Sequence, residues 1–156
     1  GGGTMITVRG CHFPAHLLYD VENHIWYERQ TDGSFRIGMT SVAIALAGDV
    51  LAFTPRRVGR PTQAGRACAT VESGKWVGPA RIVFDGTVIA VNEAMIDRPS
   101  LANRDCYGAG WMLLAMPADE APIARLVSGN QIAEAYEAWM ARENFPGCGA
   151  AEPPPR

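Results

Sequence analysis

The feature that most constrains the fold is a succession of short β-prone segments separated by glycine and proline turns. Residues 25–27 lead to Asp32-Gly33, a dipeptide typical of hairpin turns. Residues 67–72 and 82–92 are two further β-prone segments, and they are separated by turn-forming residues as well. Short strands with frequent turns of this kind predict a small β-sandwich or β-barrel.

One short helix is expected inside this β region. Thr40 can cap a helix over residues 41–47, and Gly48 would end it. A strand over residues 50–53 follows, and Gly78-Pro79 predicts a bend before the next strand. The β pattern then continues to residue 114.

The two ends of the chain differ from this middle part. Residues 1–23 predict an irregular arm with some helix near residues 17–21. Near the other end, Ser128 and Gln131 match a capping box, and an apolar helical face follows. That face cannot stay in water, so we expect the helix to pack across one end of the β domain. The face consists of Ile132, Tyr136, Trp139 and Met140. The predicted division is an arm (1–23), a β domain (24–127), a helix (128–145) and a flexible tail (146–156).

Composition excludes several classes of protein. The net charge is -2, which lacks the basic excess of a nucleic-acid-binding or polybasic membrane-binding protein. Charged residues make up 19% and hydrophobic residues 47%, as in a compact globule rather than a disordered chain. The absence of a signal-peptide pattern and of a long apolar run predicts a cytoplasmic protein with no membrane span.

The four cysteines and three histidines show no metal-site spacing, so we expect no metal. Cys68 lies in a segment of small residues and is expected to be a buried apolar filler, whereas Cys106 lies in a loop. Cys11 and Cys148 flank the domain and are candidate redox thiols. Two inert thiols are the favoured interpretation, because pairing needs a proximity that sequence does not show.

The basic residues are almost all arginine. Of 14 basic residues thirteen are arginine, and the one lysine is Lys75. A coding bias toward arginine explains the thirteen, but it does not explain why one position kept lysine. Gly74 precedes Lys75 between two β-prone segments, so the lysine should project from the tip of a tight hairpin.

An exposed amine at a hairpin tip is suited to acylation. A solvated lysine is charged and a poor nucleophile, whereas Schiff-base chemistry needs a desolvated one. Arginine cannot replace this lysine, because a guanidinium does not form the amide. The alternative is an ordinary surface lysine paired with Glu72, and composition and spacing leave both interpretations open.

The segment at residues 65–75, GRACATVESGK, is similar to the lipoyl-attachment segment of glycine cleavage system H proteins. This resemblance implies a mainly β fold, a barrel-sandwich hybrid of two facing antiparallel sheets with a short internal helix and a C-terminal helix. It implies that lipoate is amide-linked to Lys75. It also implies that lipoate ligase or other lipoylating enzymes recognise Glu72, Ser73, Gly74 and Trp76. The other matching stretches are residues 25–27, 32–33, 37–40, 46–49, 86–94, 103, 105, 107–108 and 110–111.

Two regions depart from the H-protein pattern. After the lysine, H proteins usually continue with small and acidic residues, whereas this chain has WVGPAR at residues 76–81. H proteins tend to be acidic where this chain has Arg56, Arg57 and Arg60. The charge of a docking face governs the choice of partner more than the fold does, so these departures argue for different partners.

A second resemblance covers nearly the whole chain. The motif ESGKWVGPA at residues 72–80, with RGCHFP at 9–14 and AYEAWMA at 135–141, resembles the lipoate-binding proteins of bacterial sulfur oxidation, which are relatives of H protein. This resemblance implies a carrier, not a catalyst, that presents bound sulfur to a heterodisulfide-reductase-like complex and works with sulfur-transfer proteins. The alternatives are an H protein carrying an aminomethyl group and an unmodified interaction module.

Two further features have open interpretations. Trp76 either shields the arm or contacts a partner, with simple packing on its strand as the alternative. Four arginines are a candidate partner patch or anion-favouring rim, with a solvated loop as the alternative. These are Arg56, Arg57, Arg60 and Arg81.

Overall fold

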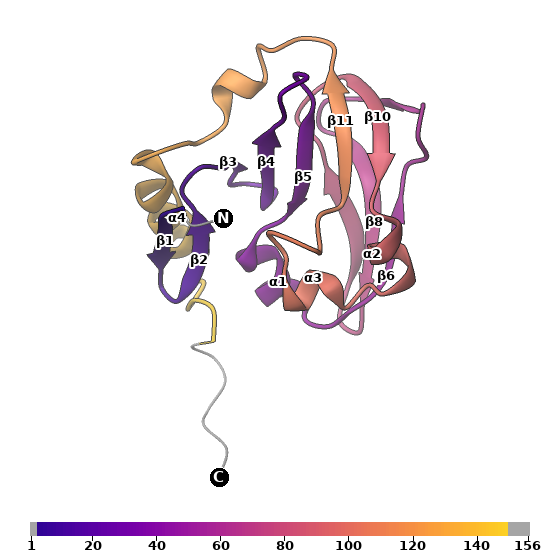
Figure 1. Ribbon diagram of the computed structural model, residues 1–156. Coiled ribbons are helices and arrows are strands. Elements are labelled where there is room, and N and C mark those ends of the chain that lie inside the picture. Colours follow the sequence, from indigo (N-terminus) through magenta and orange to yellow (C-terminus); the bar gives the residue numbers. More distant parts are fainter. Residues whose placement is uncertain (1–2, 150–156) are drawn as a thin grey trace.

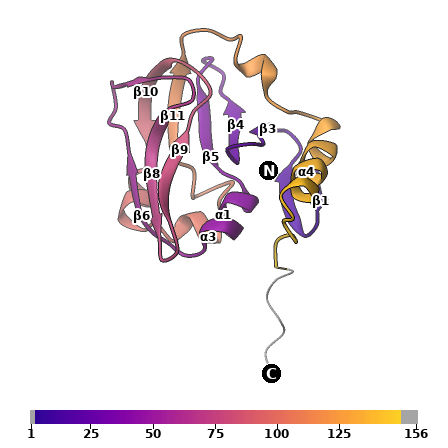
Figure 2. The same ribbon diagram turned by 180° about the vertical axis from the view of Figure 1, so that it is seen from behind.

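A computed structural model describes residues 3–149 of the chain. Two β-sheets form the main body, and a smaller lobe beside them combines an N-terminal hairpin with the C-terminal helix (Figures 1 and 2). The strands are β1 (Met5–Val8), β2 (Cys11–Pro14), β3 (Leu18–Asp20), β4 (Ile25–Arg29), β5 (Phe35–Met39), β6 (Val50–Pro55), β7 (Pro61–Thr62), β8 (Ala67–Ser73), β9 (Val77–Arg81), β10 (Gly86–Val91) and β11 (Leu113–Pro117). The helices are α1 (Ser41–Ala47), α2 (Glu93–Asp97), α3 (Leu101–Arg104), the short 3-10 helix η1 (Ile123–Arg125) and α4 (Gln131–Arg142).

Two antiparallel sheets enclose the main core. One has six strands in the order β3-β4-β5-β11-β10-β7, and the other has three in the order β6-β8-β9. Side chains from both sheets meet in one cluster, in which Ile37 and Leu113 of the larger sheet and Val71 of the smaller are buried. The predicted mainly β fold of the barrel-sandwich type, with an internal and a C-terminal helix, is confirmed.

Local sequence signals form the elements that they predict around the start of the domain. Gly33 has a φ of 89°, and the Asp32 carboxylate accepts hydrogen bonds from the backbone and hydroxyl of Ser34, which closes the β4–β5 hairpin. Thr40 caps α1, because its hydroxyl accepts from the Ala43 N–H at 3.3 Å. Gly48 ends α1 with a φ of 74°.

The expectation of an irregular arm with a helix near residues 17–21 is wrong. β1 and β2 form a hairpin whose turn, Arg9-Gly10, has positive φ at both residues. β3 pairs with β4 and so extends the six-stranded sheet. These strands are three or four residues long, which is too short for an alternating pattern to identify them from sequence.

Gly78 and Pro79 lie inside β9 and do not form the predicted bend. Pro79 on β9 pairs with Thr70 on β8. β9 is an outer strand of the three-stranded sheet, where a missing N–H is tolerated. The apolar run at residues 82–92 is divided, because residues 82–85 are not a strand and β10 begins at Gly86.

Two short helices, α2 and α3, interrupt the region that was expected to be all β up to residue 114. The Asn92 side chain caps α2 by accepting from the Met95 N–H. Met95 and Ala102 anchor the two helices in the main core. Helices of five and four residues contain little more than one turn, so they leave no helical period in the sequence.

α4 begins at Gln131, and in the described part of the chain its first turn has no side-chain cap. The predicted capping box of Ser128 and Gln131 is therefore wrong, although the Gln131 N–H does donate to the Ser128 carbonyl. The predicted apolar face is buried, but it packs on the N-terminal hairpin, where Tyr136 stacks on Phe13 with ring centroids 4.1 Å apart. The buried residues Trp26 and Val42 connect this second cluster to the β domain.

Part of the expected flexible tail is held in place. The Cys148 N–H donates to the Arg9 carbonyl at 3.0 Å, and a Cβ on Gly147 would overlap that same carbonyl oxygen. Residues 150–156 of the expected tail lie outside the described residues. Among the helices of the described part, none has the length and hydrophobicity to cross a membrane.

Candidate functional site: the Lys75 hairpin

Lys75 lies in the turn between β8 and β9, as the sequence predicts. Ser73 organises this turn: its backbone N–H donates to the Trp76 carbonyl at 2.7 Å, and its hydroxyl accepts from the Lys75 N–H at 3.3 Å. Ser73 is buried, whereas Gly74 and Lys75 are exposed. The three-residue turn therefore presents the lysine amine to solvent.

The alternative pairing of Lys75 with Glu72 does not occur. Both side chains are exposed, and neither forms an ion pair with any residue in the described range 3–149. The lysine instead lies over the end of α1, where its Cε is 3.5 Å from the place that a Cβ on Gly48 would take. The side chain of Lys75 therefore lies within van der Waals reach of position 48, where a side chain longer than a methyl group would meet it.

Asn103 on α3 fixes this end of α1. Its amide nitrogen donates to the Gly48 carbonyl at 2.8 Å, and its amide oxygen accepts from the Val50 N–H at 2.9 Å. One side chain thus joins α3 to the connection between α1 and β6. Gly48 and Asn103 lie in stretches that match the H-protein pattern, but their position beside Lys75 depends on tertiary contacts and was not inferred from the sequence.

Exposed apolar side chains flank the lysine. Trp76 is 44% exposed and Val77 is 65% exposed, directly after Lys75. Leu46 is 49% exposed at the end of α1, and Leu51 is 62% exposed at the start of β6. We call these four residues the apolar rim. Such a rim suits contact with a partner protein around the lysine.

Trp76 packs against Gly78 and is also partly exposed, so packing is observed, while shielding of the arm or contact with a partner stays a prediction. A Cβ on Gly78 would overlap the Trp76 ring, so the indole packs against this glycine of β9. The other part of the ring is exposed and borders a groove of about 330 Å³. β9, α1 and the turn at residues 22–24 form the walls of this groove.

Two of the candidate arginines meet at the opposite end of β8 from Lys75. Both lie beside Ala67, the first residue of β8. Arg56 Nε donates to the Ala67 carbonyl at 3.2 Å, and Arg81 on β9 is paired with Ala67 in the sheet register. The seven residues of β8 span roughly 20 Å between this end and the lysine turn. Arg81 does line the groove beside Trp76, so it is the one member of the patch with a connection to the site.

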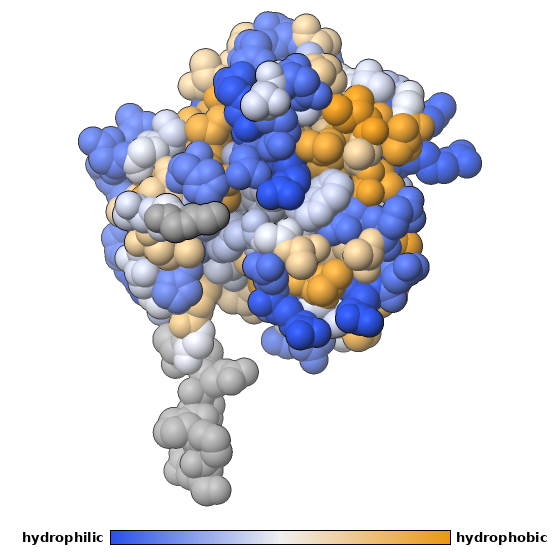
Figure 3. Space-filling view, viewed as in Figure 1, coloured by the Kyte–Doolittle hydropathy of each residue, from blue (hydrophilic) through white to orange (hydrophobic). Residues whose placement is uncertain are grey.

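The other two arginines, Arg57 and Arg60, are exposed in the loop after β6. The Arg60 N–H donates to the Arg57 carbonyl, so a local turn holds the pair together. On the face seen in Figure 3, hydrophobic residues gather near β10 and β11, and hydrophilic side chains protrude at the edge beside them. Arg56 and Arg81 lie at the far end of β8 from Lys75, and Arg57 and Arg60 lie in the loop after β6, so the structure does not gather the four arginines into a rim around Lys75.

Cys11 and Cys148 form a disulfide across a sequence separation of 137 residues, so the preferred interpretation of two inert thiols is wrong. The β1–β2 hairpin and the segment after α4 bring them together. Cys68 is buried, as expected, and burial raises the pKa of its thiol to about 12. Burial also raises the pKa of the Cys106 thiol to about 12, with a smaller contribution from the charge of Asp105.

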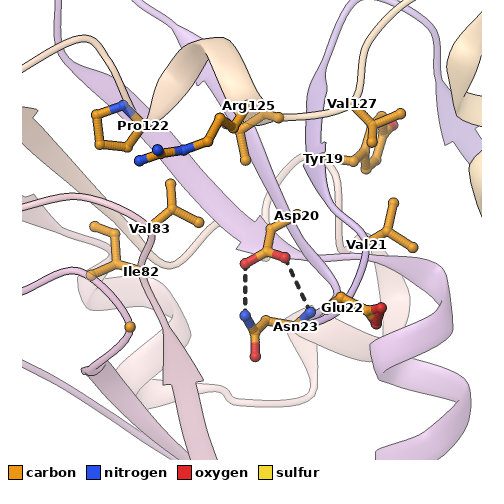
Figure 4. Close-up of a pocket in the computed structure, with 12 residues that line it drawn as sticks. Tyr19, Asp20, Val21, Glu22, Asn23, Ile82, Val83, Pro122, Arg125 and Val127 are labelled. Carbon is orange, nitrogen blue, oxygen red and sulfur yellow. Dashed lines mark hydrogen bonds between the residues drawn. The ribbon is translucent and has the colours of Figure 1, made fainter.

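A larger hollow of about 410 Å³ lies between β3, residues 82–83 and the segment before α4 (Figure 4). The Asp20 carboxylate, which lines this hollow, accepts two hydrogen bonds from Asn23: one from its side-chain amide at 2.8 Å and one from its backbone N–H at 3.3 Å. No residue of the Lys75 turn lines this hollow. Within residues 3–149 no cluster of His, Cys, Asp or Glu has a metal-binding arrangement.

The chain is similar to known proteins over most of its length. The profile of the family described as "Glycine cleavage H-protein" matches residues 17–139. "Glycine cleavage system H protein 5" of Aquifex aeolicus (strain VF5) is 41% identical over 149 residues, which cover 93% of this chain and 100% of the relative. The "Glycine cleavage system H protein" of Shewanella sp. (strain MR-7) is 38% identical over 132 residues, which cover 85% and 98%.

A solved structure agrees with these relatives. The crystal structure of a glycine cleavage system H protein from Mycobacterium marinum superposes with a TM-score of 0.70 at 29% identity, covering 85% of this chain and 100% of that one. Members of this family are lipoyl carriers and not catalysts. The chain therefore belongs to the glycine cleavage H-protein family.

Proposed function

We propose that this protein is a lipoyl carrier whose lipoyl group is amide-linked to Lys75. H proteins carry lipoate on a lysine, and Lys75 is the one lysine of this chain. The observation that carries the proposal is the exposed position of that lysine at a hairpin tip, without an ion pair in the described part of the chain. An unpaired, exposed amine fits acylation, because a modifying enzyme can reach it without unfolding the turn.

The residues of the turn hold the amine for the lipoylating enzyme. Ser73 fixes the turn through its hydrogen bonds, and Gly74 leaves the approach to Lys75 open, since nothing lies within 4 Å of the place of its missing Cβ. Glu72, the residue before Ser73 on β8, is exposed and gives an enzyme a charge to recognise. Trp76 offers an aromatic surface on the other side.

When bound, the lipoyl group supplies a redox-active disulfide on a long flexible tether. Tethering replaces diffusion by a high local concentration at each partner's active site. The apolar rim around Lys75 provides a surface for such partners. The disulfide between Cys11 and Cys148 lies at the other end of α1, beside Ser41.

The relatives support glycine cleavage as the pathway. The named H proteins cover nearly the whole chain, and the family profile includes the Lys75 turn. In this role the arm carries an aminomethyl group between the glycine cleavage enzymes, and those enzymes are the partners.

Sulfur oxidation is the second candidate, with a heterodisulfide-reductase-like complex and sulfur-transfer proteins as partners. It is favoured by the sequence WVGPAR after Lys75, which places Trp76 and Val77 in the apolar rim.

Affinity capture from the native cell separates these pathways. We expect wild-type protein to recover lipoylating enzymes and one set of pathway enzymes, and Lys75→Arg to recover less of both. Recovery of glycine decarboxylase without a heterodisulfide-reductase-like subunit assigns glycine cleavage, and the reverse assigns sulfur oxidation. Recovery of equal amounts by both variants contradicts a role for a lipoyl arm.

A further inference from the structure

The short helix α1 has Lys75 at one end and a disulfide at the other. The Lys75 side chain lies over Gly48, directly after the helix. Cys148 Sγ lies 3.7 Å from the carbonyl oxygen of Ser41, the first residue of the helix. Seven helical residues rise about 10 Å, so a short span separates the lysine from the disulfide.

One face of α1 connects these two points. Ser41 and Ala45 are four residues apart, a spacing that aligns them along the helix, and Gly48 follows directly after the last helical residue. Ala45, between the other two, is exposed and carries only a methyl group. Ala45 therefore adds only a methyl group to the exposed surface of α1 between its two ends.

We infer that the Cys11–Cys148 disulfide is a second redox site, which exchanges electrons with the arm on Lys75. This inference rests on the proposed lipoylation of Lys75. A lipoyl group extends about 9 Å beyond Nζ, given seven bonds that each advance about 1.25 Å. That reach matches the length of α1, and the flexible lysine side chain extends it further.

The exchange balances in atoms and electrons. Cys148 is the partly exposed partner, and a thiolate of the reduced arm attacks its Sγ. The Cys11–Cys148 bond breaks, and Cys11 leaves with the electron pair and takes up a proton. The second thiol of the arm then displaces Cys148, which becomes a thiol. The arm's two thiols are oxidised to its ring disulfide, and both cysteines are reduced. A flavoprotein lipoamide reductase that uses NADH returns the arm to its dithiol form.

The surroundings suit a disulfide that opens and closes. A reduced Cys148 thiol finds an acceptor in the Ser41 carbonyl oxygen, which already lies 3.7 Å from the sulfur. The hydrogen bond from the Cys148 N–H to the Arg9 carbonyl does not involve the sulfur, so it holds Cys148 near Cys11 after reduction. Disulfides in reducing compartments are commonly transient and redox-active, which agrees with the cytoplasmic placement expected from the sequence.

The test uses the full lipoylated chain at about 10 µM, with lipoamide reductase and NADH to reduce the arm. Samples are quenched in acid, alkylated under denaturing conditions and weighed intact, with peptide mapping of Cys11 and Cys148. We expect both cysteines to become alkylated at a rate that does not depend on protein concentration. Tethered groups have effective concentrations near 1 mM, so this rate should exceed by about 100-fold that of Lys75→Arg with 10 µM free dihydrolipoamide.

Two matched variants test the path along α1. Ala45→Trp should slow the exchange about tenfold, because an indole would stand between the arm and Cys148. Ala138→Trp, at an exposed alanine on α4, should leave the rate unchanged. The inference is overturned if the arm is reduced while Cys11 and Cys148 stay oxidised, or if their opening rate rises in proportion to protein concentration. Absence of a lipoyl group from Lys75 in the native protein would instead overturn the proposed function and, with it, this inference.

Discussion

Lys75 passes over Gly48 with its Cε 3.5 Å from the place of a Cβ that glycine lacks. The exposed amine of the β8–β9 turn and the end of α1 are therefore neighbours, although 27 residues separate them in the sequence. Asn103 fixes the backbone on both sides of this contact through Gly48 and Val50. The contact makes position 48 part of the site, and this can be tested directly.

Gly48→Leu should disturb the presentation of Lys75. Gly48 has a φ of 74° and a ψ of -151°, a backbone region that is essentially confined to glycine, so a leucine costs about 1–3 kcal/mol in backbone strain and also pushes against the lysine. Gly59→Leu is the control, since Gly59 has a φ of 89° with open space around it. Urea denaturation should show similar losses in both variants, while in vitro lipoylation slows several-fold in Gly48→Leu alone. Equal lipoylation rates would show that the contact has no role.

Lys75→Arg should fold normally and lose lipoylation. The side chain is exposed, so we expect the free energy of unfolding to change by less than about 0.5 kcal/mol. The double variant Lys75→Arg/Arg81→Lys moves the amine to the other end of β9 and should also stay unmodified. Mass spectrometry after incubation with lipoate ligase checks both variants. Lipoylation at position 81 of the double variant would mean that any exposed amine suffices.

Much of the β domain follows from local sequence, and the parts that do not are built from distant residues. The Asp32-Gly33 hairpin, the Thr40 cap and the Lys75 turn are determined within a few residues, so they were predictable. The N-terminal hairpin instead depends on α4 and on Cys148 for its partners. The contact of Lys75 with the end of α1 is likewise tertiary.

His24 should make the protein less stable in weak acid. Burial lowers the pKa of His24 to about 4, and its Nδ1 has no hydrogen-bond partner in the described part of the chain. Between pH 6.5 and pH 4 the unfolded chain binds the proton more strongly than the folded protein, so stability falls as pH falls. From pH 7 to pH 5 this amounts to about 2 kcal/mol.

The variant His24→Asn isolates this effect. Asparagine tolerates the positive φ of 57° at this position and does not titrate. Denaturation at pH 7 and pH 5 should show that His24→Asn removes most of the difference of about 2 kcal/mol. His12→Asn, at an exposed histidine, should keep it. A wild-type difference that survives in His24→Asn would assign the pH dependence to other groups.

The disulfide should stabilise the fold substantially, because its two cysteines are 137 residues apart in the sequence. Loop-closure entropy predicts about 3–5 kcal/mol for a loop of this length. Adding a strong reductant to wild-type protein should therefore lower the denaturation midpoint to that of Cys11→Ser/Cys148→Ser. Cys106→Ser should respond to reductant as wild type does. If the reductant has no effect on wild-type stability, the bond does not contribute to the fold.

The central claim is that Lys75 carries a lipoyl group in the cell. The most direct measurement is the intact mass of the protein purified from its native source, followed by peptide mapping of residues 67–81. We expect an added mass equal to one lipoyl group, located on Lys75. A native protein with an unmodified Lys75, in cells that lipoylate other proteins, would contradict it.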